Sequence, residues 1–342
     1  MEYTSLSSTD STYHGIEFVF QPFGSTVFYG IFLFISIGSV VGNSLVIAAY
    51  KIDKSLRKRP TNTLLISLAV TDFLTGLIAI PFYTLARGIK SDFTCSGNTR
   101  FLLFFPGMLF GVSSVTHLTV IAMDRYIAVS RPLRYPRLVT KKRCVITLVA
   151  GAVFSIIACS WPVFTMDSLD DETFCEEEKK TDVVTSFVLA LSLIIVLYFG
   201  IMIFCHICMI RTALKHVRLR RTLSTSARPE QSGAEDAKSR LRATVTVAII
   251  MGAFIICWAP TAFKFLFQSF FSYSEHCFLI VQVTCEVLFY ANSMVNPIIY
   301  GYRNVQYRLG YMKALHSCCP CIIKKPLGQA FSIVSKQRPS IV

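Results

Sequence analysis

The chain has 342 residues, of which 53% are hydrophobic and only 16% are charged, and its mean hydropathy is +0.54. This composition is too apolar for a soluble globular protein of such length and indicates a membrane protein. A formal net charge of +14 suggests nucleic-acid binding in a soluble protein, but here the basic residues gather between apolar stretches, so nucleic-acid binding is not supported.

Seven stretches are apolar and long enough for a transmembrane helix, which needs about 20 residues. They lie at roughly 27–50, 61–86, 98–130, 142–164, 182–210, 243–270 and 276–301. Polar segments separate them, and no long internal repeat is visible. The expected fold is an all-α membrane protein, a seven-transmembrane helix bundle. The sequence divides into a polar tail at 1–26, a seven-helix domain at 27–302 and a second tail at 303–342.

The basic residues predict the orientation of the chain. Four segments hold 27 of the 34 lysines and arginines, namely 51–60, 131–143, 211–242 and 303–342. The loops on the other side are acidic, above all at 170–178. Because basic loops stay cytoplasmic, we expect a multi-pass plasma-membrane protein with its N-terminus extracellular and its C-terminus cytoplasmic. We also expect the basic segments to attract anionic membrane lipids.

Polar side chains interrupt the apolar stretches, and ionisable groups inside a membrane are functional candidates by default. They are Asn43, Asp72, Ser114, Asn292, Ser293 and Asn296. An aspartate at mid-membrane needs partners, which hydroxyl and amide groups on neighbouring helices can supply. The cluster could hold a monovalent cation against the carboxylate of Asp72, or it could be a polar plug that joins helices. Spacing alone favours neither interpretation.

Two prolines fall inside predicted helices, each next to an aromatic residue. The sequence "CWAP" contains Trp258 and Pro260, and "NPIIY" contains Pro297 and Tyr300. A proline within a helix frees a backbone carbonyl and introduces a kink. One kink would favour a static bend, whereas two with such neighbours favour hinges.

Five motifs occur in order along the chain: "GN" at 42–43, "LAVTD" ending at Asp72, "DRY" at 124–126, "CWAP" and "NPIIY". With these motifs, residues 27 to 320 resemble a rhodopsin-like (class A) G-protein-coupled receptor, with local likeness to adenosine and melanocortin receptors. The resemblance implies a receptor rather than an enzyme, and a short amphipathic eighth helix in "YRNVQYRLGY". It also implies a heterotrimeric G protein, arrestin, receptor kinases and an extracellular small-molecule or peptide ligand as partners.

The resemblance assigns roles on the cytoplasmic side. Asp124 restrains Arg125 at rest, and Arg125, beside Tyr126, engages the G protein once the sixth helix moves. Tyr198 and Tyr300 support the active arrangement. The implied switch residues are Phe254, Trp258, Pro260, Asn296 and Pro297, with Leu118 and Phe254 in contacts that rearrange.

The polar cluster matches the sodium pocket of this family residue by residue. The matching residues are Asp72, Ser114, Asn292, Ser293 and Asn296. We therefore expect allosteric Na⁺ beside Asp72 and no other cofactor.

The chain departs from the family pattern in several places. Arg240 stands where many members carry an acid that pairs with the arginine of the "DRY" motif, so elevated basal activity is a hypothesis. The fifth helix lacks the usual proline and has Ala190 instead, and the usual fourth-helix tryptophan is missing. Cys95 lies further from the "DRY" motif than the usual third-helix cysteine. We still expect a Cys95–Cys175 disulfide in the oxidising exterior, with Cys277 as a competing partner.

The candidate ligand pocket opens outward above Trp258. Its residues are Asp182, Ser186, Thr261, Phe265, Gln282, Glu286 and Tyr290. The position of the aspartate in amine receptors is Gly107, and the position of the retinal-linking lysine is Tyr290, so both ligand types are disfavoured. Phe265 stands where adenosine receptors have their binding asparagine.

Glu286 and Asp182 suggest a cationic small molecule or peptide, because an anion near the pocket attracts a cation. Alternatively, Glu286 pairs with Lys264 or Tyr290 and contacts no ligand, which we slightly favour. An adenosine-like purine receptor is a second interpretation, although Glu177 replaces a key second-loop phenylalanine. A seven-helix transporter or channel is a different class, and no broken helices in matching halves support a transporter.

The cytoplasmic segments offer sites for modification. Thr222 and Ser224 follow two arginines in "RRTLS", and the tail contains Ser332, Ser335 and Ser340. Cys318, Cys319 and Cys321 follow the predicted amphipathic helix and are candidates for palmitoylation.

Overall fold

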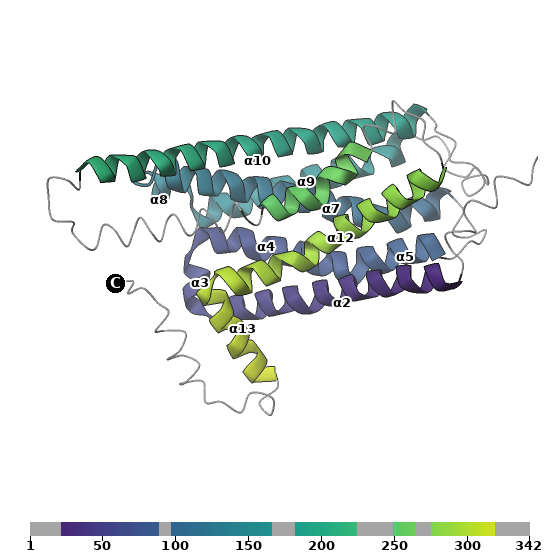
Figure 1. Cartoon of the computed structure of the whole chain (residues 1–342), viewed down its shortest axis with the longest axis horizontal. Coiled ribbons are helices and arrows are strands. Elements are labelled where there is room, and N and C mark those ends of the chain that lie inside the picture. Colours follow the sequence, from purple (N-terminus) through teal and green to yellow (C-terminus); the bar gives the residue numbers. More distant parts are fainter. Residues whose placement is uncertain are drawn as a thin grey trace, which may run out of the picture.

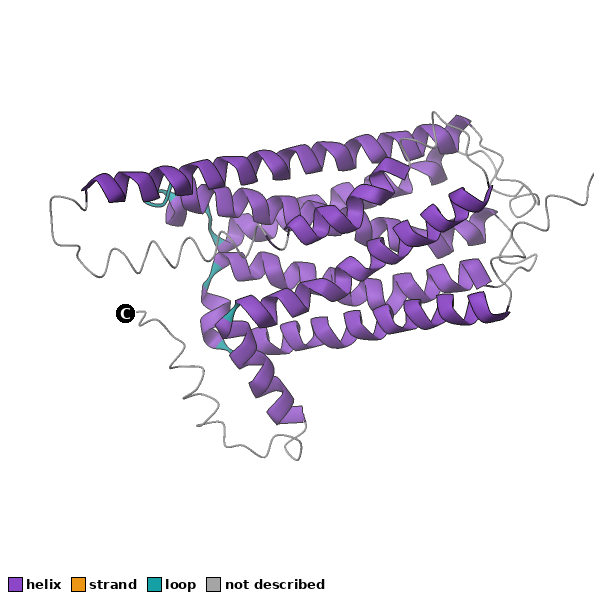
Figure 2. Ribbon diagram, viewed as in Figure 1, coloured by secondary structure: helices purple, strands orange, loops and turns teal. Residues whose placement is uncertain are grey.

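The computed structural model describes residues 22–88, 97–165, 182–223, 249, 251–264 and 275–318. Within these ranges all regular structure is helical, and the long helices run side by side (Figures 1 and 2). They are α2 (Pro22–Ile52), α4 (Pro60–Leu74) continued by η1 (Thr75–Ala79) and α5 (Ile80–Gly88), α7 (Gly97–Ser130), α9 (Lys141–Thr165), α10 (Asp182–Leu223), Met251–Lys264 and α12 (Glu275–Arg303). Each predicted apolar stretch therefore contains one helical unit, and the predicted bundle is confirmed.

Five of these units are long and apolar enough to cross a membrane, judged on the described residues. They are Thr26–Ile52, Pro60–Arg87, Phe101–Ser130, Lys141–Trp161 and Ser186–Thr212. The helix Met251–Lys264 is apolar but shorter within the described part of the chain. α10 continues thirteen residues beyond the predicted end at 210, because the Leu-, Lys- and Arg-rich sequence that follows also favours helix.

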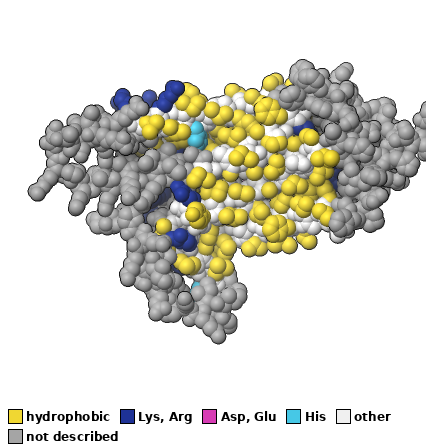
Figure 3. Space-filling view, in the orientation of Figure 1, with side chains coloured by type: hydrophobic (Ala, Val, Ile, Leu, Met, Phe, Trp, Pro, Cys, Tyr) yellow, Lys and Arg dark blue, Asp and Glu magenta, His cyan; other side chains and the backbone are white. Residues whose placement is uncertain are grey.

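The outer surface of the bundle is apolar and the interior contains polar groups. Large side chains such as Phe34, Ile157 and Ile256 are more than half exposed, at 67%, 67% and 69%. Figure 3 shows hydrophobic side chains over the middle of the visible face. Asn43 and Asp72, by contrast, are fully buried. This arrangement suits a bundle surrounded by lipid, in which polar groups face the interior.

The second helical unit contains a π-helical turn, η1, which begins three residues after Asp72. A π turn disturbs the regular ladder of backbone hydrogen bonds, and the Ser36 hydroxyl donates to the carbonyl of Gly76 at 2.7 Å. A side chain on Gly76 would lie only 2.9 Å from the carbonyl oxygen of Ser36, so the close approach of α2 requires glycine here. The turn therefore sets the rotation of α5, whose residues lie beyond it.

The predicted eighth helix is present as α13 (Val305–Cys318), which leaves the bundle at a steep angle (Figure 1). It packs closely on α2, since a side chain on Gly310 would lie 2.5 Å from the Cβ of Ala49. Tyr307, near the start of α13, is fully buried. The Tyr311 hydroxyl donates to the carbonyl of Pro297 at 3.1 Å, so α13 is anchored to the kinked part of α12.

Candidate functional site

Asp72 lies at the centre of the bundle, where three helical units meet. Its carboxylate accepts a hydrogen bond from the Asn296 amide at 2.8 Å and a longer one from the Ser114 hydroxyl at 3.4 Å. The Ser293 side chain also lies near this carboxylate. Asp72 is 0% exposed. The structure therefore brings together four of the five residues of the predicted sodium pocket around one carboxylate.

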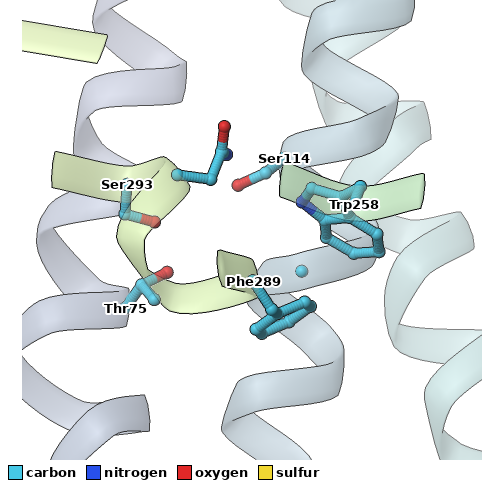
Figure 4. A pocket seen from close by; sticks show the side chains of 7 residues that line it. Thr75, Ser114, Trp258, Phe289 and Ser293 are labelled. Atoms are coloured by element: carbon cyan, nitrogen blue, oxygen red, sulfur yellow. The ribbon is translucent and has the colours of Figure 1, made fainter. Parts of the chain in front are cut away.

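The fifth residue, Asn292, lines a small cavity next to this cluster (Figure 4). The volume that the centre of a water molecule can occupy in this cavity is about 10 Å³, so the cavity has room for about one water. Its lining residues are Thr75, Gly111, Ser114, Trp258, Phe289, Asn292 and Ser293. In Figure 4 the hydroxyls of Thr75, Ser114 and Ser293 lie on one side of it, and the rings of Trp258 and Phe289 on the other. The cavity thus separates the polar cluster from the predicted aromatic switch.

Trp258 is the centre of an aromatic group above the cavity. Its ring stacks on Phe254 with centroids 5.4 Å apart and contacts Phe289 at 4.7 Å. A side chain on Gly111 would lie 2.7 Å from the Phe289 ring and 3.1 Å from that of Trp258, so α7 can approach only with glycine there. Phe254 and Leu118 are both fully buried in the same core, as the predicted packed contacts require. Any shift of Trp258 must therefore move its neighbours on α7 and α12.

The ends of α4, α7 and α8 (Tyr135–Leu138) meet around Asp124 and Arg125. The Arg125 guanidinium donates to the Asp124 carboxylate, with N···O distances of 2.5 and 2.8 Å. Asp124 also accepts hydrogen bonds from the Tyr135 hydroxyl at 2.8 Å and the Thr61 hydroxyl at 3.0 Å. Arg125 donates further to the hydroxyls of Thr61 and, at 3.2 Å, Tyr135. The predicted Asp124–Arg125 pair is present, and four side chains form one network.

The surroundings of Tyr135 keep its phenol protonated. Burial, and then the charge of Asp124, raise the pKa of Tyr135 from 10 to about 12, so the phenol, which is protonated at neutral pH in any case, remains a hydrogen-bond donor to a higher pH than an ordinary tyrosine. Neither Thr61 nor Tyr135 is among the site residues predicted from the sequence. The only signal was the proximity of Tyr135 to the "DRY" motif in the chain, ten residues after Arg125.

The other residues of the predicted coupling region lie apart from this network. Tyr126 packs near Phe204 and Tyr198 near Phe154, with ring centroids 6.5 and 6.4 Å apart. Tyr300 is buried, and its hydroxyl has no hydrogen-bond partner among the described residues. Pro260 lies within the helix Met251–Lys264, and Pro297 lies within α12. Arg240 lies outside the described residues.

A second charged pair lies at the opposite end of the bundle from Arg125. Glu286 on α12 accepts a hydrogen bond from the Arg87 guanidinium of α5 at 2.7 Å. It also accepts from the Tyr83 hydroxyl and from the Gln282 amide, the latter at 3.1 Å. The sequence suggested Lys264 or Tyr290 as partners of Glu286, whereas the ion pair that the structure gives it is with Arg87, 199 residues away in the chain.

The Tyr290 hydroxyl fills the space beside Gly107, which is the position where amine receptors have an aspartate. A Cβ on Gly107 would lie 2.6 Å from the Tyr290 hydroxyl oxygen. Thr261 donates to the backbone carbonyl of Cys285 at 3.3 Å, so it joins two helices. Ser186 is exposed on α10.

Several predicted residues cannot be assigned contacts. Phe265, Cys95, Cys175, Cys319 and Cys321 lie outside the described residues, and so do the side chains of Asp182 at the start of α10 and Cys318 at the end of α13.

Comparison with known proteins assigns the family. The sequence profile of the 7 transmembrane receptors of the rhodopsin family matches residues 42–300. The chain is 31% identical to the histamine H2 receptor of Cavia porcellus over 294 residues, which cover 82% of this chain and 76% of that receptor. It is also 31% identical to adenosine receptor A2b of Canis lupus familiaris over 327 residues, 85% of this chain and 91% of the relative. A Gq-coupled rhodopsin of Mizuhopecten yessoensis is 27% identical over 313 residues, 87% of this chain and 61% of the relative.

The profile covers most of the chain. The motifs around Asp72, Arg125, Trp258 and Pro297 lie inside the matched range. The chain therefore belongs to the rhodopsin family of seven-transmembrane receptors, and it is a G-protein-coupled receptor rather than an enzyme.

Proposed function

We propose that the receptor resides in the plasma membrane with its N-terminus outside, and that Arg125 is its point of engagement for the G protein. The observation that carries this proposal is the network at the end of α7. The positive charge of basic loops on that side supports a cytoplasmic location. A ligand that binds near Glu286, at the other end, shifts the bundle between two states.

The network supplies the restraint of the inactive state. Asp124 neutralises Arg125, while Thr61 and Tyr135 complete the hydrogen bonds of the carboxylate. Charge-assisted hydrogen bonds are stronger than neutral ones. Arg125 reaches a G protein only after these bonds break, so agonist binding must stabilise the arrangement in which they are broken. Tyr126, Tyr198 and Tyr300 are proposed to support that arrangement.

The polar cluster is proposed to hold Na⁺. Asp72 is buried, and the ion pairs present among the described residues join other groups. An uncompensated buried carboxylate is costly, and oxygen ligands suit a hard cation. The residues that would hold the ion are Asp72, Ser114, Asn292, Ser293 and Asn296. When bound, the ion would supply a positive charge that neutralises Asp72, and these side chains would orient the carboxylate.

Further parts of the proposal concern the receptor's surroundings. Receptor kinases and arrestin act on the serines and threonines of the cytoplasmic segments. Cys318, Cys319 and Cys321 are palmitoylated, which holds α13 to the membrane surface. A Cys95–Cys175 disulfide closes the extracellular side. Anionic lipids contact the basic loops.

The ligand is proposed to be a small organic molecule or peptide with a cationic group. Glu286 supports this class because it is a carboxylate near the outer end of the bundle. The adenosine receptor among the relatives makes a purine the second candidate, and the histamine receptor makes small amines part of the same screen.

The first experiment measures cAMP, calcium and G-protein dissociation in cells that express the receptor without any ligand. We compare the wild type with Arg125→Ala and with a matched control, Arg131→Ala, which removes an exposed arginine six residues further along the chain. Basal signalling that persists in the control and disappears in Arg125→Ala supports the coupling role. Equal signalling in Arg125→Ala and wild type would overturn it.

A further inference from the structure

The pair of Arg87 and Glu286 is surrounded by groups that recognise an organic cation. The Glu286 carboxylate accepts hydrogen bonds from three side chains, those of Arg87, Tyr83 and Gln282. The Arg87 guanidinium carbon lies 5.8 Å from the ring centroid of Tyr83 and 5.9 Å from that of Phe104. Both distances are within the range of about 6 Å for cation–π attraction. One carboxylate and two rings therefore contact the guanidinium, and the Gln282 amide hydrogen-bonds to the carboxylate.

Arg87 is the only member of this group that has a positive charge. It lies in the last turn of α5 and reaches across to Glu286 on α12. Its side chain therefore occupies the space between these two helices. When Arg87 leaves, Glu286 keeps Tyr83 and Gln282 as donors but loses its counter-ion. A carboxylate left unpaired in a largely buried position is unfavourable. The remaining groups then favour any cation of the same shape.

The ion pair of Arg87 and Glu286 is partly exposed. The side chains of Arg87 and Glu286 are 24% and 18% exposed, so neither is sealed in the core. The alternative position for a ligand cation, on α7 at Gly107, has no acid and is filled by the Tyr290 hydroxyl. Cation recognition in this receptor is therefore better supported between α5 and α12 than on α7.

We propose that Glu286, Tyr83, Phe104 and Gln282 form a binding box for an organic cation of the guanidinium type, that Arg87 fills this box in the structure, and that a cationic ligand group takes its place. A guanidinium fits better than an ammonium, because its planar donors match a carboxylate in pairs and stack on rings. The inference deepens the proposed function, and it rests on that function only in placing the box within the ligand pocket.

A chain of side-chain contacts connects Arg87 to the switch residue Trp258, so exchange of Arg87 for a ligand cation would affect that residue. Arg87 joins α5 to α12, and Tyr83 packs on Tyr290 with ring centroids 5.1 Å apart. The preceding residue, Phe289, contacts both Tyr290 and Trp258, with ring centroids 4.8 and 4.7 Å apart. Replacement of Arg87 by an untethered cation preserves the charge of the box but releases the link between the two helices.

The test uses purified full-length receptor and measures its unfolding temperature with ethylguanidinium, or with ethylurea as a neutral molecule of the same shape. The variants are Arg87→Ala and the double variant Arg87→Ala/Glu286→Gln, which also removes the carboxylate charge. We expect ethylguanidinium, but not ethylurea, to raise the unfolding temperature of Arg87→Ala saturably. Its apparent Kd for Arg87→Ala is expected to be about tenfold lower than for the wild type, in which Arg87 competes.

The double variant distinguishes the box from general effects of the cation. Loss of the response in Arg87→Ala/Glu286→Gln supports the proposal. An equal response in both variants, or no response in Arg87→Ala, would overturn it. If Arg87→Ala accumulates poorly in cells, ethylguanidinium in the medium is expected to raise the surface expression of this variant. If ethylguanidinium and ethylurea both leave its surface expression unchanged, that result counts against the box. None of these measurements needs a G protein, so failure of the proposed coupling is separately detectable.

Discussion

The side-chain amide of Asn43 on α2 donates a 2.9 Å hydrogen bond to the backbone carbonyl of Ser293 on α12. Ser293 lies four residues before Pro297, and proline has no N–H to donate, so this carbonyl lacks its ordinary helical partner. A side chain on Gly42 would lie 3.0 Å from the ring of Pro297. The sequence "GN" thus supplies both the space and the donor that the kink of α12 requires.

Replacing Asn43 with alanine is expected to lower the free energy of unfolding by about 1 kcal/mol, because a buried carbonyl is left without a donor. Thermal unfolding of the purified receptor measures the change. Ser39→Ala is the control, since the Ser39 hydroxyl is buried without a hydrogen-bond partner among the described residues. Equal destabilisation by the two variants would contradict the role of Asn43.

Tyr135→Phe is expected to raise basal signalling about two- to fivefold. The variant removes the hydroxyl that donates to Asp124, and one hydrogen bond of about 0.5–1 kcal/mol shifts a two-state equilibrium by that factor. Ligand-free G-protein dissociation, normalised to surface expression, is the measurement. Tyr302→Phe provides a control on an exposed tyrosine at the same end of the bundle. Unchanged signalling in Tyr135→Phe would show that the network does not restrain Arg125.

Removal of sodium should distinguish an ion site from a polar plug. When choline replaces Na⁺ in the buffer, we expect the unfolding temperature of the wild type to fall and that of Asp72→Asn to stay constant. The amide keeps the shape of the side chain but has no charge for the ion to neutralise. The idea fails if both proteins respond alike.

Gly310→Ala tests the docking of α13 on α2. The added methyl group would lie 2.5 Å from the Cβ of Ala49 and 3.1 Å from its Cα, so the two helices must separate. Overpacking of this kind costs about 1–3 kcal/mol, and we expect a lower unfolding temperature and faster hydrogen exchange in α13. The matched control is Gly200→Ala, because no atom lies near that position and alanine favours helix. Equal stability of Gly310→Ala and wild type would show that the contact is dispensable.

Asp53 gives the α13 contact a dependence on pH. Burial alone raises its pKa, but hydrogen bonds from Ser55 and the charge of Lys313, 3.7 Å away, together lower the pKa below the ordinary 3.8. The carboxylate therefore contributes stability that is fully present above pH 3.8 and is lost as the pH falls through the lowered value. We expect the difference in unfolding temperature between wild type and Asp53→Asn to be constant from pH 7 to 5 and to shrink below 3.8. A difference that grows on acidification would reverse the assignment.

The sequence by itself determined the seven helical stretches, because each must hide its backbone from lipid within one continuous apolar segment. It also identified the members of the Asp72 cluster, since polar groups inside such segments are conspicuous against an apolar background. Their common position could be expected only through the family resemblance, as Asp72 and Asn296 lie 224 residues apart in the chain.

Only the tertiary structure decided which charges pair. Neither Thr61 nor Tyr135 differs from an ordinary loop or helix residue in the sequence, yet both donate to Asp124. Likewise, the ion pair of Glu286 is with Arg87 of α5, which lies 199 residues away in the chain. These contacts depend on helix rotation, on the π turn before α5 and on glycines that set the distances between helices. Such long-range geometry leaves no periodic pattern in the sequence, so it becomes visible only when the helices are packed.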